Sequence, residues 1–275
     1  MKDMIRSMLR KIATFSIVSD DLMQDVKSYD TTAYDFITNI HTTAVLPISS
    51  VIISIILVLE LARNATHMEG DHQMGVKIIA ATMFKSALLV IAAQNSTMFL
   101  DAINEVSTKI IKGINTTTVN YGSAITDQVI SLVSDLDTAD QAGMIMMLLI
   151  PFLITITAQV IIKVLIFFRF AELYAMSAFA SLPIAFLGHP DTKSMGVTYL
   201  QKYAAVSLQG ATLMLSVYIY TSLMASKFID FRALNGEKKL TEWMFNHYID
   251  FVVPPILLLI LIFASGKIAK SLVGQ

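Results

Sequence analysis

Residues 142–187 read AGMIMMLLIPFLITITAQVIIKVLIFFRFAELYAMSAFASLPIAFL, and only three charges interrupt this apolar run. A helix crosses the hydrocarbon core with about 20 apolar residues, so the run is too long for one crossing and suits two. Backbone that turns inside lipid leaves polar groups unsatisfied, so the turn should lie at an interface. The charges are Lys163, Arg169 and Glu172. They predict one span at about 142–164, a tight interfacial turn, and another span at about 171–187.

The composition of the whole chain agrees with a membrane protein. Of its 275 residues, 55 % are hydrophobic and 15 % are charged, and the mean hydropathy is +0.65. These values are far from those of a soluble globular domain. The net charge of −1 gives no global basic field for a nucleic-acid surface. The absence of cysteine excludes disulfides, thiol catalysis and cysteine-ligated metal sites.

Hydropathy predicts an all-α fold, a polytopic helix bundle of about six spans. Besides the two spans in the long run, further spans are expected at about 44–62, 76–93, 204–225 and 249–265. The chain then divides into an N-terminal amphipathic helix and linker (1–43), two early spans (44–93), an external helical segment (94–141) and a four-span core (142–275) with a cytoplasmic loop (226–248).

The N-terminal region and the 94–141 segment both carry apolar residues at helical spacing. In the first region Ile5, Met8, Leu9 and Ile12 alternate with basic residues. That pattern is typical of a helix lying on the membrane surface or on a partner, or of one folded onto the protein's own bundle. The 94–141 segment contains two such stripes separated by a turn-like GINTTTVNYGS, which predicts a helical hairpin outside the membrane.

Orientation follows from the basic residues near the span ends. More of them lie on the side that includes the 226–248 loop, so the positive-inside rule places this loop in the cytoplasm. The N-terminus is then outside.

The sequence contains no catalytic constellation. The five histidines lie in separate segments without zinc-type spacing on one helix face, and there is neither a Walker-type phosphate loop nor a Gly-x-Ser-x-Gly elbow. The chain is therefore expected not to be an enzyme, and no cofactor or metal is expected.

Lys85 is the one charge near the middle of a predicted span. Because a mid-membrane lysine is costly in lipid, its side chain should face protein or water. It is a candidate for lining an aqueous path; the structural alternatives are an ion pair with Glu60 or Glu172, or snorkelling from a shifted span. Gln159 and Gln209 are candidates for polar contacts between helices or along a path. Arg169 and Glu172 are three residues apart, which is close enough to pair on one helical turn.

The segment from Phe168 to Ala225, FRFAELYAMSAFASLPIAFLGHPDTKSMGVTYLQKYAAVSLQGATLMLSVYIYTSLMA, resembles a known family. It is similar to the core of the TrbL-like channel subunit of conjugative type IV secretion systems, in the Gram-positive plasmid and transposon branch. The likeness lies in an arginine and an aromatic before AELY, in SLPIAFLG at the end of a span, and in the aromatic-rich YLQKYAAVSLQG.

This resemblance implies a subunit of a DNA-transfer machine in the cytoplasmic membrane. Such proteins form homo-oligomers, lie in membrane lipid, and contact a secretion ATPase and bitopic scaffold subunits, with possible transient contact to the transferred single-stranded DNA. By resemblance, Arg169, Glu172 and Pro183 mark the hairpin, and its cytoplasmic turn could dock a partner. Lys163, the third charge of the apolar run, is a further candidate for this docking group.

Two other functions compete with the channel or scaffold role. A small-molecule transporter or permease is the alternative, but such proteins often show two related halves, and the first three predicted spans do not visibly repeat as the last three. A membrane enzyme needs paired acids, a nucleophile and base, or a metal set at membrane depth, and none of these is present.

Overall fold

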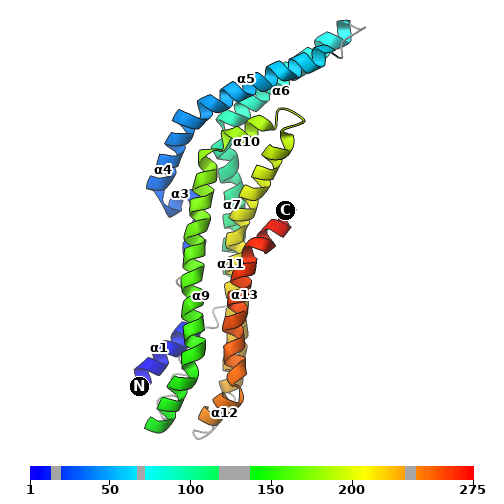
Figure 1. The fold of residues 1–275 in the computed structure, drawn as a ribbon. Coiled ribbons are helices and arrows are strands. Elements are labelled where there is room, and N and C mark those ends of the chain that lie inside the picture. The colour runs from blue at the N-terminus through cyan, green and yellow to red at the C-terminus, as the bar shows by residue number, and fades with distance from the viewer. Residues whose placement is uncertain (14–19, 67–71, 118–136, 233–239) are drawn as a thin grey trace. The chain divides into compact units, whose positions relative to one another are not determined.

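The computed structural model describes residues 1–13, 20–66, 72–117, 137–232 and 240–275, and all regular structure in these ranges is helical (Figure 1). The elements are α1 (Lys2–Ala13), α3 (Val26–Tyr29), α4 (Thr31–Ile40), the π-helix η1 (His41–Val45), α5 (Leu46–Thr66), α6 (His72–Gln94), α7 (Ser96–Thr117), α9 (Thr138–Ala178), α10 (Ser181–Phe186), α11 (Lys193–Arg232), α12 (Leu240–Asn246) and α13 (Tyr248–Leu272).

Five helical stretches among the described residues are long and apolar enough to cross a membrane. They are Thr31–Ala65, Gly75–Gln94, Thr138–Ala178, Lys193–Ser226 and Tyr248–Leu272. The predicted all-α polytopic bundle is therefore confirmed, with five candidate spans where about six were expected.

The missing span is explained by α9, which runs without a break from Thr138 to Ala178. The predicted turn between 164 and 171 is wrong. Arg169 does not require an interface, because neighbouring side chains enclose it completely and leave 0 % of it exposed. The backbone hydrogen bonds of the helix stay satisfied through this position, so lipid imposes no break there. At about 1.5 Å per residue, α9 is roughly twice as long as the hydrocarbon core is thick.

The chain reverses direction later, between α10 and α11. The Thr192 hydroxyl donates a hydrogen bond of 2.8 Å to the carbonyl of Phe186, and the Lys193 amide donates one of 2.9 Å to the carbonyl of His189. These bonds give partners to backbone groups at the end of α10 and the start of α11. The prediction of which side of the membrane each later loop faces assumes two spans joined by a turn within 164–171. Because α9 has no such turn, the structure does not test that prediction.

The chain folds into two compact units. The first comprises Met1–Met23, Thr108–Phe168 and Gln209–Ile268, and the second comprises Gln24–Ser107, Arg169–Leu208 and Ala269–Gln275. The helices α7, α9, α11 and α13 each contribute residues to both units.

In the first unit, α1 packs on the protein's own bundle, which is one of the two arrangements its sequence allowed. The apolar residues that the sequence analysis singled out in α1 are buried, with exposed fractions of 0–4 %: Ile5, Met8, Leu9 and Ile12. The Tyr220 hydroxyl donates a hydrogen bond of 2.8 Å to the carbonyl of Ile12. Because this carbonyl is near the end of α1, it lacks a helical partner, and the tyrosine supplies one.

The second unit is built around the antiparallel pair α5 and α6, on which α10 packs. Ile53, Ala93, Ile184 and Ala185 form a buried apolar cluster there. A Cβ on Gly188, just after α10, would lie 2.6 Å from Cδ2 of Leu89, so a larger residue there would require the Leu89 side chain to shift.

The predicted external helical segment is represented by α7, which forms the first of its two expected helices. In the second unit α7 packs on α11: the Ser107 hydroxyl donates to the carbonyl of Ser207, and the Ser207 hydroxyl donates to Oδ1 of Asn104 at 3.1 Å. The second expected helix, from Ile125 to Leu136, lies outside the described residues.

Candidate functional site in the spanning helices

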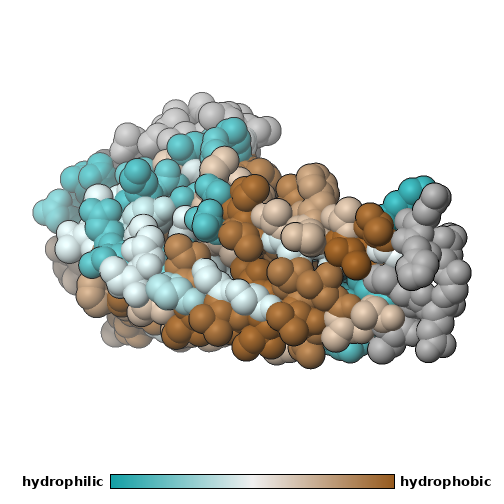
Figure 2. Space-filling model, turned by 90° about the horizontal axis from the view of Figure 1, so that it is seen from above, coloured by the Kyte–Doolittle hydropathy of each residue, from teal (hydrophilic) through white to brown (hydrophobic). Residues whose placement is uncertain are grey.

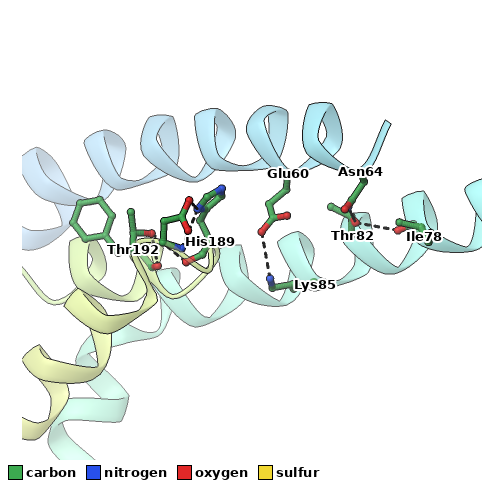
Figure 3. Close-up of polar contacts among 9 residues, drawn as sticks. Glu60, Asn64, Ile78, Thr82, Lys85, His189 and Thr192 are labelled. Carbon is green, nitrogen blue, oxygen red and sulfur yellow. Dashed lines mark hydrogen bonds and ion pairs between the residues drawn. The ribbon is translucent and has the colours of Figure 1, made fainter. Parts of the chain in front are cut away.

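Two polar contacts join α5 and α6 inside their apolar surroundings (Figure 3). Nζ of Lys85 lies 3.8 Å from Oε1 of Glu60, and the Asn64 amide donates a hydrogen bond of 2.7 Å to Oγ1 of Thr82. Glu60 and Asn64 are one turn apart on α5, and Thr82 and Lys85 are one turn apart on α6. These four residues form a polar seam along one side of the hairpin, which we call the α5–α6 seam.

The α5–α6 seam places Lys85 beside one of the partners that its sequence position allowed. The Glu60 side chain is 12 % exposed, whereas the Lys85 side chain is 57 % exposed. A carboxylate and an ammonium in apolar surroundings lower each other's desolvation cost when they pair. Because more than half of the Lys85 side chain is exposed, the ion pair does not prevent it from lining an aqueous path. That role stays a prediction.

The turn between α10 and α11 lies near the same hairpin, as the contact of Gly188 with Leu89 indicates. Figure 3 shows His189 and Thr192 in this turn. Nδ1 of His189 lies 3.6 Å from Oδ2 of Asp191 and accepts a hydrogen bond of 3.3 Å from the Asp191 amide. These contacts are local to the turn and give it a defined shape.

Arg169 lies in the second unit, where it is fully buried. Its guanidinium carbon is 4.9 Å from the ring centroid of Phe170, and that ring stacks on Tyr29 at a centroid distance of 3.8 Å. None of the three guanidinium nitrogens has a hydrogen-bond acceptor among the described residues. A buried arginine is ordinarily paired, so this residue is exceptional.

Arg169 and Glu172 do not pair, although their spacing allowed it. Glu172 pairs instead with Lys202 of α11, at an Nζ–Oε1 distance of 3.1 Å. Spacing along a helix makes an ion pair possible, but here a cation on the neighbouring helix reaches the carboxylate. Pro183, the remaining residue of the predicted docking group in this unit, lies in α10, and its carbonyl faces Gly196 of α11.

The other predicted site residues belong to the first unit. Lys163 is exposed on α9. The Gln159 amide donates a hydrogen bond of 3.2 Å to the carbonyl of Lys11 in α1. The Gln209 side chain approaches Gly266 of α13, where an added Cβ would lie 3.5 Å from Nε2. Both glutamines thus contact other helices, as polar groups in spans are expected to do.

Sequence reasoning missed a further pair in the second unit. The Tyr34 hydroxyl of α4 donates a hydrogen bond of 2.7 Å to Oδ2 of Asp101 in α7. Burial raises the pKa of Asp101 and is the largest influence on it; the Tyr34 bond lowers this pKa, as does Lys27, whereas Asp25 raises it. The sequence predicts that 94–141 lies outside the membrane, which gives no reason to single out Asp101, and only the helical spacing of α7 indicates a buried side.

No group of side chains in the part of the chain that the structure describes has the composition of a metal site. The polar groups named above hold helices together or lie along their sides, through ion pairs and hydrogen bonds.

A family model described as TrbL/VirB6 plasmid conjugal transfer like protein matches residues 12–181. The match includes Lys85, Arg169 and Glu172, and it ends before Pro183 and most of the segment that carried the resemblance. No curated protein and no solved structure matches the chain. Because the family match covers more than half of the chain, the protein belongs to the TrbL/VirB6 plasmid conjugal transfer-like family and is a multi-pass membrane component of a conjugal transfer system.

Proposed function

We propose that this protein is a non-enzymatic channel or scaffold subunit that helps form the route for DNA and protein across the cytoplasmic membrane. The observation that carries the proposal is the family match, which takes in the α5–α6 hairpin and the whole of the 41-residue α9 together with the charges they contain. We further propose that the protein belongs to a system of the Gram-positive branch, as the resemblance of residues 168–225 implies.

The exposed surface of the α5–α6 hairpin supports a role inside a larger assembly. Only 11 % of the most apolar window of α6 is buried within the chain. Figure 2 shows an extended hydrophobic surface on one face of the molecule. The exposed apolar residues of α5 and α6 include Val51, Ile55, Val58, Phe84, Leu88 and Ile91. Lipid or other subunits must cover such a surface.

The proposed partners follow from the family resemblance and the family match. They are further copies of this chain, the secretion ATPase and bitopic scaffold subunits of the same system, with transient contact to the transferred single strand. Lys85 is the residue of the α5–α6 seam that would contact the transferred strand, because its exposed ammonium carries a positive charge that attracts phosphate.

A mating assay with an in-frame deletion, complemented in trans, tests the proposal. We expect transfer of the conjugative element to collapse in the deletion strain and to return with the complementing gene, while growth and element copy number stay normal. Transfer that is unaffected by the deletion would refute a role in conjugation and leave the transporter or permease as the better interpretation.

A second measurement separates a subunit from a free-standing transporter. The protein, solubilised in mild detergent from cells carrying the whole element, should migrate as a large complex and co-purify with the ATPase or scaffold subunits. A single small particle without these partners, under conditions that preserve other complexes of the system, would contradict the subunit role.

A further inference from the structure

Helix α1 presents a basic face to its surroundings, because its apolar residues point into the first unit. Its charged side chains are four basic ones and one acidic one: Lys2, Arg6, Arg10, Lys11 and Asp3. Arg6 is partly exposed and the other four are exposed. An excess of positive charge therefore lies on the side of α1 that faces away from its own bundle.

Two hydrogen bonds fix the C-terminal end of α1 to the long helices of the first unit (Figure 1). The Gln159 amide of α9 donates one of 3.2 Å to the carbonyl of Lys11. The Tyr220 hydroxyl of α11 donates one of 2.8 Å to the carbonyl of Ile12. The level of α1 along these helices is thereby defined.

That level is the depth of the hydrocarbon core. Gln159 lies within residues 142–168, a stretch of α9 in which Lys163 is the one charge. Charged side chains at this depth face protein or water and not lipid. Because Arg10 and Lys11 are exposed, they must face an aqueous space or an anionic partner in the assembled protein.

A hollow of about 490 Å³ opens beside this face of α1. Within the described chain it is lined by Asp3, Arg6, Ser7, Arg10 and Lys11, and we call it the α1 hollow. Oδ1 of Asp3 pairs with Nη1 of Arg6 at 3.5 Å, and the Asp3 side chain is 97 % exposed. Two guanidiniums, an ammonium and a hydroxyl thus line one space with a single carboxylate. The volume is in the range of small-ligand sites, about 300–1,000 Å³.

The basic residues of α1 also form a row. Lys2, Arg6 and Arg10 are four residues apart, so they recur about every 6 Å along one side of the helix. A row of this kind suits a ligand that carries charge at intervals, and a nucleic-acid strand carries one at every phosphate. Each guanidinium has five N–H donors, so it can hold a neighbouring group and a phosphate together.

We propose that the α1 hollow binds the phosphates of a single nucleic-acid strand. Arg6, Arg10 and Lys11 supply positive charge, and Ser7 supplies a hydroxyl donor. This inference rests on the proposed function, which brings a single strand to the protein, and it adds the residues that meet the strand. It also accounts for exposed basic side chains at hydrocarbon depth, because a strand in transit requires an aqueous space there.

A bilayer surface fits α1 less well than a strand does. A helix that binds lipid headgroups inserts its apolar face at the boundary of the acyl chains. In α1 that face is turned into the first unit, which leaves Met1 and Met4 exposed at its start. Headgroups also lie at the interface, whereas the end of α1 is bonded to Gln159.

The test is binding of a fluorescein-labelled single-stranded DNA oligonucleotide to the purified full-length protein in neutral detergent, measured by fluorescence anisotropy. The variant Arg10→Gln with Lys11→Gln removes two exposed cations from the α1 hollow. We expect its Kd to rise roughly 10- to 30-fold at about 0.1 M salt. The slope of log Kd against log salt concentration should fall by about 1.4, because each phosphate contact of a single strand contributes about 0.7.

Two control variants separate the site from net charge. Lys267→Gln with Lys270→Gln removes two exposed cations from α13 and should bind the oligonucleotide as the wild type does. Arg10→Lys with Lys11→Arg keeps both charges and should retain the salt slope. The substituted side chains are all exposed, so each variant should keep the unfolding temperature of the wild type.

Protection of a single cysteine tests the site without removing a charge. Ser7→Cys places a thiol in the α1 hollow, and Ser226→Cys places one at an exposed position of α11. We expect the oligonucleotide to slow labelling of Ser7→Cys by a sulfonate-bearing maleimide and to leave Ser226→Cys unchanged. Equal labelling of Ser7→Cys with and without the oligonucleotide would contradict the site.

Three further results would overturn it. One is equal oligonucleotide affinity in the wild type and in Arg10→Gln with Lys11→Gln. Another is an equal loss of affinity in the α13 control, which would reduce the effect to net charge. The third is binding of soluble dioctanoyl phosphatidylglycerol that depends on Arg10 and Lys11, without binding of the oligonucleotide, since the hollow would then hold lipid headgroups.

Failure of the strand site is distinguishable from failure of the proposed function. If deletion of the gene abolishes conjugative transfer while the α1 variants bind the oligonucleotide normally, the function stands and the site is wrong. If transfer survives the deletion while binding depends on Arg10 and Lys11, the function is wrong and the site stands.

Discussion

Glu172 of α9 and Lys202 of α11 form an ion pair of 3.1 Å, so the carboxylate nearest to Arg169 in sequence is already paired with another cation. The Lys202 side chain is 51 % exposed and the Glu172 side chain 25 % exposed. The two helices are therefore joined by a solvated ion pair here and by the hydrogen bond that the Tyr199 hydroxyl of α11 donates to the carbonyl of Met176 in α9.

A double-mutant cycle on Glu172→Gln and Lys202→Met should give a small coupling energy. We expect about 0.2–1 kcal/mol in unfolding experiments at low salt, because exposed ion pairs are screened and lose side-chain entropy. The coupling should shrink further at high salt. A coupling well above this range that salt does not alter would show that the pair is enclosed in the native protein.

The stability of the protein should depend on pH through Asp101. Since burial raises its folded-state pKa above the ordinary value of 3.8, the native state binds this proton more tightly than the unfolded chain. The stabilising contribution is present in full below the ordinary pKa and is lost as pH rises through the folded-state pKa. Asp101→Asn retains an acceptor for Tyr34 and should flatten the decline in unfolding temperature from about pH 4 upward. Equal slopes in the variant and the wild type would rule out Asp101 as the source.

Two glycines in helices should respond to alanine in opposite directions. An added Cβ on Gly196 would lie 2.4 Å from the carbonyl oxygen of Pro183 and 2.6 Å from Cδ2 of Leu187, so α10 and α11 must separate. We expect Gly196→Ala to destabilise the protein by about 1–3 kcal/mol. Gly113 has nothing within 4 Å of that position, and Gly113→Ala should stabilise α7 by about 0.5–1 kcal/mol. A harmless Gly196→Ala would mean that α10 does not pack this closely on α11.

Docking of α1 can be measured with single cysteines, because the natural chain has none. Ile5 is 0 % exposed, and Ser7 is exposed on the opposite face of α1. A water-soluble maleimide should label Ser7→Cys readily and Ile5→Cys slowly. Tyr220→Phe removes the hydrogen bond to the carbonyl of Ile12 and should speed labelling of Ile5→Cys. Equally fast labelling of both cysteines in the unaltered background would show that α1 is not docked.

Substitution of Lys85 addresses transfer itself. We expect Lys85→Leu to insert at normal levels and to reduce conjugative transfer, because the charge at this depth is lost. Lys77→Leu, at the start of the same helix, serves as the matched control and should transfer normally. The double variant Glu60→Gln with Lys85→Leu removes the unpaired carboxylate left behind. Restoration of transfer in the double variant would assign Lys85 to helix pairing and not to a path.

The sequence alone determined the class of this protein and the location of several spans. Hydropathy predicted spans at about 44–62 and 76–93, and the structure forms α5 and α6 there. Apolar spacing likewise predicted helices at α1 and α7. These properties are local, because a stretch of apolar residues must form a helix in lipid whatever its neighbours are.

The sequence could not decide how charges and polar groups find their partners. Lys85 had two acidic candidates, and the pairing of α5 with α6 selected Glu60. Arg169 was expected to mark a turn, yet α9 continues through it because neighbouring side chains bury it completely. The pair of Tyr34 with Asp101 joins residues 67 positions apart. Partner choice depends on which helix faces meet and how each helix is rotated, and only tertiary packing determines those two quantities.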